Sequence, residues 1–73
     1  MNLKALILSV VLTAYLGSHN GQLALFHEGH ERPVKTYPLS IVMLPVSDQK
    51  ALTNGIPIRN NLQLAQLLED FLS

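Results

Sequence analysis

The sequence predicts an α+β fold in which a small antiparallel sheet, made of a β-hairpin and a third strand, is covered by two short C-terminal helices. Three observations predict this fold. The pair Asn20–Gly21 lies between two apolar runs and is typical of a two-residue hairpin turn. Residues 34–44 form an extended apolar segment, and residues 47–72 carry the start and stop signals of two helices. With 73 residues, the chain is expected to form one domain at most.

The hairpin follows from the backbone geometry of its turn. Both central residues of a type I′ turn have positive φ angles, which Asn and Gly tolerate. A two-residue loop then fixes which residues face one another: Tyr15 and Phe26, Leu16 and Leu25, Gly17 and Ala24, Ser18 and Leu23. Both faces of this hairpin carry apolar side chains, so the pattern leaves open which face meets the helices.

The third strand is expected within residues 34–44, after a polar loop formed by residues 28–33. Pro38 has no N–H group to donate to a neighbouring strand, so it should lie at a sheet edge or outside the ladder. The uninterrupted part of the strand is therefore expected at residues 39–44.

The first helix is predicted over residues 48–53. Ser47 is the expected N-cap, and Asp48 lies favourably near the positive end of the helix dipole. Leu52 is expected to anchor the helix, and Gly55 is a natural left-handed stop. The segment that begins at Ile56 and runs to residue 58 is then extended.

The last helix is expected to begin at Asn60 or Asn61, either of which can cap it. At 100° per residue its apolar side chains fall on one arc: Leu64, Ala65, Leu67, Leu68, Phe71 and Leu72. The opposite arc carries Gln63, Gln66, Glu69, Asp70 and Ser73. Phe71 is central in the apolar arc and is expected to be the core side chain that matters most.

Residues 1–14 are predicted to be a signal-like or membrane-anchor segment that precedes a domain at residues 15–73. Residues 5–16 carry no charge and follow a short start with Lys4, as in a secretory signal. The run is shorter than the roughly 20 apolar residues of an ordinary membrane span. An uncleaved anchor through residues 3–16 and a buried core or oligomer strand are the alternatives.

Composition and motifs argue against several classes of function. The chain has five Lys and Arg, five Asp and Glu, and no basic cluster, so nucleic acid is an unexpected partner. Without cysteine there is no disulfide, thiolate nucleophile or thiolate metal ligand. His27 and His30 lie near Glu28 and Glu31, but Gly29 favours a solvated loop over a metal site. No catalytic residue, metal or cofactor is expected.

Several residues, in this order, carry a resemblance to a known family: Asn20, Gly21, Leu23, Ala24, Leu25, Phe26, Pro33, Leu44, Pro45, Asp48, Leu52, Gly55, Ile56, Leu64, Leu67, Leu68, Glu69, Asp70, Phe71 and Ser73. The series resembles the C-terminal domain of bypass-of-forespore-C proteins of spore-forming bacteria. The resemblance implies a small antiparallel sheet with helices packed on it, exported or facing the outside of a membrane. In the two-domain member of the family, the role is to restrain a signalling serine protease between two sporulation membranes. The family usually has acidic residues where this chain has Asn60, Asn61, Leu62 and Gln63.

The expected function is a non-catalytic regulatory module at the cell envelope that binds another protein, such as an envelope or sporulation signalling protein. Glu69 and Asp70 could form its partner surface, although adjacent carboxylates on a polar helix face are commonly just solvated. The alternative is a cytosolic accessory subunit in which the N-terminal apolar segment belongs to the core or to an oligomer interface.

Overall fold

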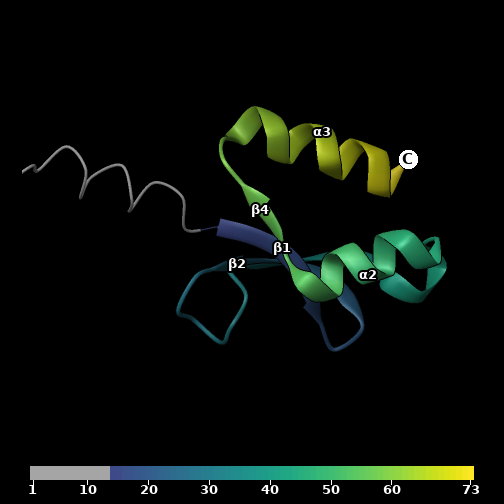
Figure 1. Cartoon of the computed structure of the whole chain (residues 1–73), viewed down its shortest axis with the longest axis horizontal. Coiled ribbons are helices and arrows are strands. Elements are labelled where there is room, and N and C mark those ends of the chain that lie inside the picture. The colour runs from purple at the N-terminus through teal and green to yellow at the C-terminus, as the bar shows by residue number, and fades with distance from the viewer. Residues whose placement is uncertain (1–13) are drawn as a thin grey trace, which may run out of the picture.

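The computed structural model describes residues 14–73. Within them the elements follow the order β1 (Ala14–His19), β2 (Gln22–His27), β3 (Lys35–Ser40), the 3₁₀ turn η1 (Ile41–Met43), α2 (Val46–Asn54), β4 (Ile56–Ile58) and α3 (Asn61–Leu72). The strands form one sheet in the order β3-β2-β1-β4, and every neighbouring pair is antiparallel (Figure 1). The predicted α+β class is confirmed, and β4 is added to the hairpin and the third strand.

The β1–β2 hairpin has the predicted turn and register. Asn20 has a φ angle of 53° and Gly21 one of 80°, as the two central positions of the turn require. The paired residues are those expected from the two-residue loop: Tyr15 and Phe26, Leu16 and Leu25, Gly17 and Ala24, Ser18 and Leu23. The local geometry of the turn was therefore sufficient to set the register.

The third strand lies earlier in the chain than predicted. It begins at Lys35, includes Pro38 and ends at Ser40, so most of the predicted segment 39–44 lies outside it. β3 is an edge strand, and its pairing with β2 shifts register between Gln22 and Ala24. Pro38 lies in this irregular stretch of an edge strand, where a missing N–H is tolerated. The chain then turns into η1, in which Ile41 N–H donates to Gly21 O at 2.9 Å.

Helix α2 is longer than the predicted 48–53 and begins before Ser47. Pro45 is its N-cap, so the prediction that Ser47 caps it was wrong. The first turn is held instead by the Gln49 side chain, whose Nε2 donates to Leu44 O at 2.9 Å. The helix stops at Gly55, where φ is 88° and ψ is 124°. The φ angle is positive as expected, but the ψ angle is extended, so the chain passes directly into β4.

The main core cluster lies on one face of the sheet, while Ala24 and Phe26 are buried on the other face. The cluster consists of Leu16, Leu23, Tyr37, Leu52 and Ile58. Helix α3 lies over this face and adds four partly buried side chains, Leu64, Leu67, Leu68 and Phe71 (Figure 1). The hairpin face that carries Leu16, Leu23 and Leu25 is therefore the one that meets α3.

Phe71 is less central than its position on the helical arc predicted. None of the side chains of α3 is buried, whereas Leu16, Leu23 and Leu52 are at most 1% exposed. The physical reason is that α3 covers the sheet as an outer layer, with solvent on its free sides. The arc predicts which side chains point inward, but it does not predict how deeply they are covered.

The end of the apolar N-terminal run belongs to the sheet. Ala14 pairs with both His27 and Ile58, and Leu16 is 0% exposed. Leu16 is thus a core residue of an inner strand, and membrane association through residues 3–16 stays a prediction. The rest of the predicted signal-like segment, residues 1–13, lies outside the described residues. In residues 14–73 no helix combines the length and apolar character needed to cross a membrane.

Candidate functional site

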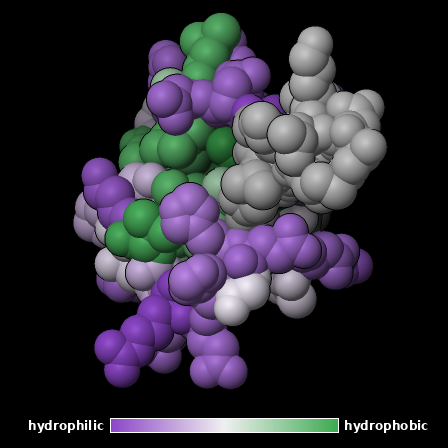
Figure 2. Space-filling model, turned by 90° about the vertical axis from the view of Figure 1, so that its left-hand side faces the viewer, coloured by the Kyte–Doolittle hydropathy of each residue, from purple (hydrophilic) through white to green (hydrophobic). Residues whose placement is uncertain are grey.

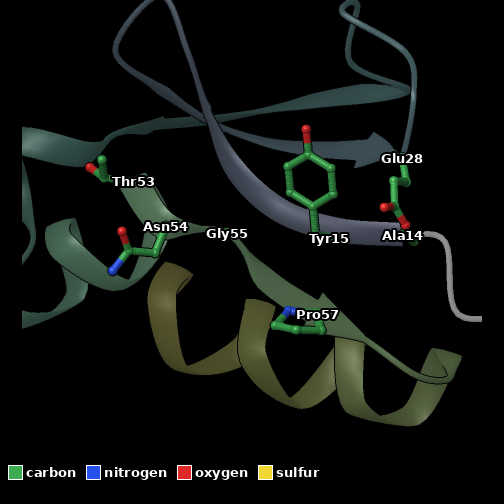
Figure 3. Close-up of a pocket in the computed structure, with 7 residues that line it drawn as sticks. All are labelled: Ala14, Tyr15, Glu28, Thr53, Asn54, Gly55 and Pro57. Carbon is green, nitrogen blue, oxygen red and sulfur yellow. The ribbon is translucent and has the colours of Figure 1, made fainter.

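The sheet face opposite α3 carries a depression of about 520 Å³. Figure 3 shows the Tyr15 side chain pointing from β1 to the side away from α3, as alternation with Leu16 requires. The pocket is lined by seven residues from three separate parts of the chain: Ala14, Tyr15, Glu28, Thr53, Asn54, Gly55 and Pro57. It is a surface formed by tertiary contacts among β1, the turn after β2, the end of α2, and β4.

The Tyr15 ring is held by packing with the neighbouring strand. It stacks on Phe26 with ring centroids 5.1 Å apart and an interplanar angle of 9°. Phe26 is itself only 7% exposed. Its ring also packs edge-to-face with the His19 ring, with the two ring centroids 6.3 Å apart. On the other side of β1, Tyr15 pairs with Pro57 of β4. One ring face is thus covered by Phe26, and Tyr15 contributes to the pocket on the β4 side.

Gly55 leaves the space that the Tyr15 ring fills. A Cβ atom built on Gly55 would lie 3.2 Å from Tyr15 Cδ2, closer than most carbon contacts in proteins. Together with the positive φ angle, this contact restricts the position to glycine. The residue that ends α2 therefore also determines how close the aromatic ring lies to the wall of the pocket.

The polar groups of the pocket include several hydrogen-bond acceptors. Glu28 is the only charged side chain among the seven lining residues, and it lies in a turn that His30 N–H closes onto His27 O at 3.2 Å. The Thr53 hydroxyl donates to Gln49 O at 2.9 Å, which leaves its oxygen lone pairs free to accept. Asn54 adds an exposed amide at the same end of α2.

The histidine-rich loop lies beside this site. His27 and His30 are both exposed, with ring centroids 6.4 Å apart. Among residues 14–73, no group of three or more His, Cys, Asp and Glu side chains is arranged to hold a metal ion.

The predicted partner residues Glu69 and Asp70 lie elsewhere on the molecule. Both are exposed in the last turns of α3, which packs on the sheet face opposite the pocket. The structure therefore does not bring the carboxylate pair and the pocket together. Of the predicted structural residues, only Gly55 lines the pocket.

Sequence reasoning did not identify Tyr15 or Glu28 as site residues. One signal was present, because the hairpin register placed Tyr15 opposite Phe26 and so predicted an aromatic pair on one sheet face. The position of Asn54 and Gly55 beside that pair required the tertiary structure.

Other apolar side chains reach the surface away from the pocket. Figure 2 views the molecule from the side at which β1 begins, and it shows apolar side chains above and below the start of α3. Leu62, in the first turn of α3, is 68% exposed. Around η1 and the start of α2, three further side chains are mostly exposed: Val42, Met43 and Val46. These residues form a surface separate from the lining of the pocket.

Comparison with known proteins gives one family match. The model of the BofC C-terminal domain matches residues 11–73, which include every described strand and helix. No curated protein and no solved structure matches the chain. The match confirms the resemblance seen in the sequence, and the chain therefore belongs to the BofC C-terminal domain family, a family of sporulation proteins.

Proposed function

We propose that this chain is a non-catalytic regulatory module of sporulation that binds another protein at the cell envelope. The observation that carries the proposal is the family match over residues 11–73. The apolar residues 5–13 support placement at a membrane or export across it, because they are uncharged and follow Lys4.

The composition of the pocket supports binding over catalysis. Glu28 is its only carboxylate, and neither histidine nor serine is among the seven lining residues. Glycosidase sites use a pair of carboxylates, which this lining lacks, and Thr53 lies at the opposite end of the pocket from Glu28 (Figure 3). A site of this kind is suited to hold a side chain of a partner.

The domain would lie close to the membrane if the segment is retained. Ala14 already belongs to β1, so no linker separates the sheet from residue 13. Ala14 also lines the pocket. A segment retained in the membrane would therefore place the pocket within a few residues of the lipid surface.

Fractionation of a spore-forming host that expresses the full-length chain with a C-terminal tag tests this placement. The expected result is that the tag is found in the membrane or exported fraction and is cut by protease added outside the cytoplasmic membrane. Replacing Leu8 and Val11 by Lys should move the protein to the cytoplasm, since each charge strongly opposes insertion. Leu62→Lys is the matched control, because Leu62 is exposed in α3, and it should not change the fraction.

A purely cytoplasmic wild-type protein would contradict the proposal and support the accessory-subunit alternative. Crosslinking in intact sporulating cells tests the binding role separately. The expected product is an adduct of this chain with another envelope protein, and recovery of the chain only as an uncrosslinked monomer would contradict that role.

A further inference from the structure

The pocket beside Tyr15 combines an aromatic ring with acceptor groups, and this combination points to the chemistry of its occupant. The ring is fixed by Phe26 and by Gly55, so it is a rigid platform. The carboxylate of Glu28, the hydroxyl oxygen of Thr53 and the amide oxygen of Asn54 supply acceptors around it. A guanidinium group has five donors, no acceptor and a plane that stacks on aromatic rings.

We infer that this pocket binds an arginine side chain of the protein partner, with the guanidinium stacked against Tyr15 and donating to Glu28. The inference rests on the proposed protein-binding function and names the chemistry of its partner. Its basis is charge complementarity, since Glu28 gives the pocket its only formal charge and that charge is negative. Its size of about 520 Å³ lies in the range of ligand sites and leaves room for the backbone beside the arginine.

The arrangement seen in Figure 3 also places the acceptors at two ends of the pocket. Glu28 lies beside Ala14 at one end, and Thr53 and Asn54 lie at the other, with Tyr15 and Pro57 between them. A long side chain that enters along the ring can therefore reach acceptors with its terminal group while its stem lies on Pro57.

A titration of the full-length, ¹⁵N-labelled chain in zwitterionic detergent micelles tests the inference. The probes are the capped peptide Gly-Arg-Gly and the same peptide with citrulline, which keeps the shape of arginine but is neutral. Saturable amide shifts are expected at Tyr15, Asn54 and Gly55 with the arginine peptide. The citrulline peptide should bind about two- to fivefold more weakly, as expected when one exposed ion pair is lost.

Two variants locate the binding groups. Glu28→Gln should weaken binding of the arginine peptide by about two- to fivefold, and Tyr15→Leu should weaken it further. Glu31→Gln is the matched control, because Glu31 is an exposed carboxylate of the same loop that does not line the pocket, and it should bind like the wild type. Glu28 is exposed, so the fold of its variant is expected to be intact, and unchanged amide shifts in β1 and β2 would verify this.

Equal binding of the arginine and citrulline peptides, or unchanged binding by Glu28→Gln, would overturn the inference. Tighter binding of free L-arginine than of the peptide would also overturn it, because it would identify a small-molecule site. These outcomes leave fractionation and crosslinking unaffected, so failure of the arginine pocket can be distinguished from failure of the proposed function.

Discussion

At the scale of single residues, two glycines with positive φ angles hold the structure for different reasons. A Cβ on Gly21 would have no atom within 4 Å, so a substitution there costs only the backbone conformation. A Cβ on Gly55 would in addition meet Tyr15 Cδ2 at 3.2 Å. A substitution at Gly21 therefore measures the cost of backbone strain alone, and one at Gly55 measures backbone strain together with a steric contact.

Gly55→Ala should destabilise the protein more than Gly21→Ala. The change at Gly21 is expected to lower the free energy of unfolding by about 1 kcal/mol, the cost of a positive φ angle for a residue with a Cβ. The change at Gly55 adds displacement of the Tyr15 ring to that cost. Urea denaturation of the two variants measures both values, and equal losses would show that the ring moves aside freely.

Leu52→Ala should be more damaging than Phe71→Ala. Leu52 is 1% exposed in the core cluster, and truncation of such a leucine costs about 2–5 kcal/mol, comparable to the whole stability of a domain this small. Phe71 is only partly buried, so its truncation should cost less than the roughly 3–5 kcal/mol of a buried phenylalanine.

Thermal melts followed by circular dichroism compare these two variants. Leu52→Ala is expected to be largely unfolded and Phe71→Ala to retain a cooperative transition at lower temperature. Phe71→Tyr should melt near the wild-type temperature, because one side of the ring reaches solvent. If Phe71→Ala fails to fold while Leu52→Ala melts normally, Phe71 contributes more to stability than Leu52, as the sequence analysis expected.

At the scale of elements, the start of α3 is fixed by a short network of hydrogen bonds. Gln63 N–H donates to Asn60 Oδ1 at 2.8 Å, which confirms Asn60 as the cap. The Gln63 side chain accepts from Arg59 N–H at 2.7 Å and donates to Pro57 O at 3.1 Å. Gln63 therefore joins the first turn of the helix to β4.

Asn60→Ala should lower the free energy of unfolding by about 0.5–2 kcal/mol, the usual cost of losing an N-cap. Gln63→Ala should also destabilise the protein, since it removes the bonds of that side chain to Arg59 and Pro57. Gln66→Ala is the control, because Gln66 is exposed in the same helix, and it should have little effect. Equal stability of all three variants in urea would show that packing alone sets the start of α3.

The polar face of α3 gives a further prediction at this scale. Glu69→Gln and Asp70→Asn should change the melting temperature little, because exposed charges contribute little to stability. Their effect on crosslinking to the partner is the informative measurement. Loss of the crosslinked product at an unchanged melting temperature would make this face a partner surface, and unchanged crosslinking would mean that the carboxylates are only solvated.

At the scale of the whole molecule, residues 14–73 form a four-stranded sheet and two α-helices. The first residue of β1, Ala14, contributes pairs to β2 and to β4. Ala14, which the sequence analysis assigned to the N-terminal segment, is therefore part of the described sheet.

A chain that lacks residues 1–13 should unfold cooperatively in urea, because every described element remains. Removal of residues 1–14 should also leave a folded domain, but a less stable one, since it takes away the residue paired with Ile58. A disordered circular dichroism spectrum for the chain without residues 1–13 would show instead that the N-terminal segment belongs to the core, as in the accessory-subunit alternative.

By itself, the sequence determined the features that depend on neighbouring residues. The Asn20–Gly21 turn set the hairpin register through its φ angles, and Gly55 set the end of α2. The start of α3 was narrowed to Asn60 or Asn61, and the structure has Asn60 as the cap. The order of these features also carried the family resemblance, which the match over residues 11–73 confirmed.

Only the tertiary structure decided which distant segments meet. Residues Ile56–Ile58 were expected to be extended, but they are a strand because β1 offers them an open edge. Pro38 is accommodated within β3 because that strand lies at the other edge. The pocket brings Tyr15 beside Glu28 and Gly55, and no local signal could place them together. Turns and caps depend on bonds across a few residues, whereas strand pairing, burial depth and pocket shape depend on contacts between segments far apart in the chain.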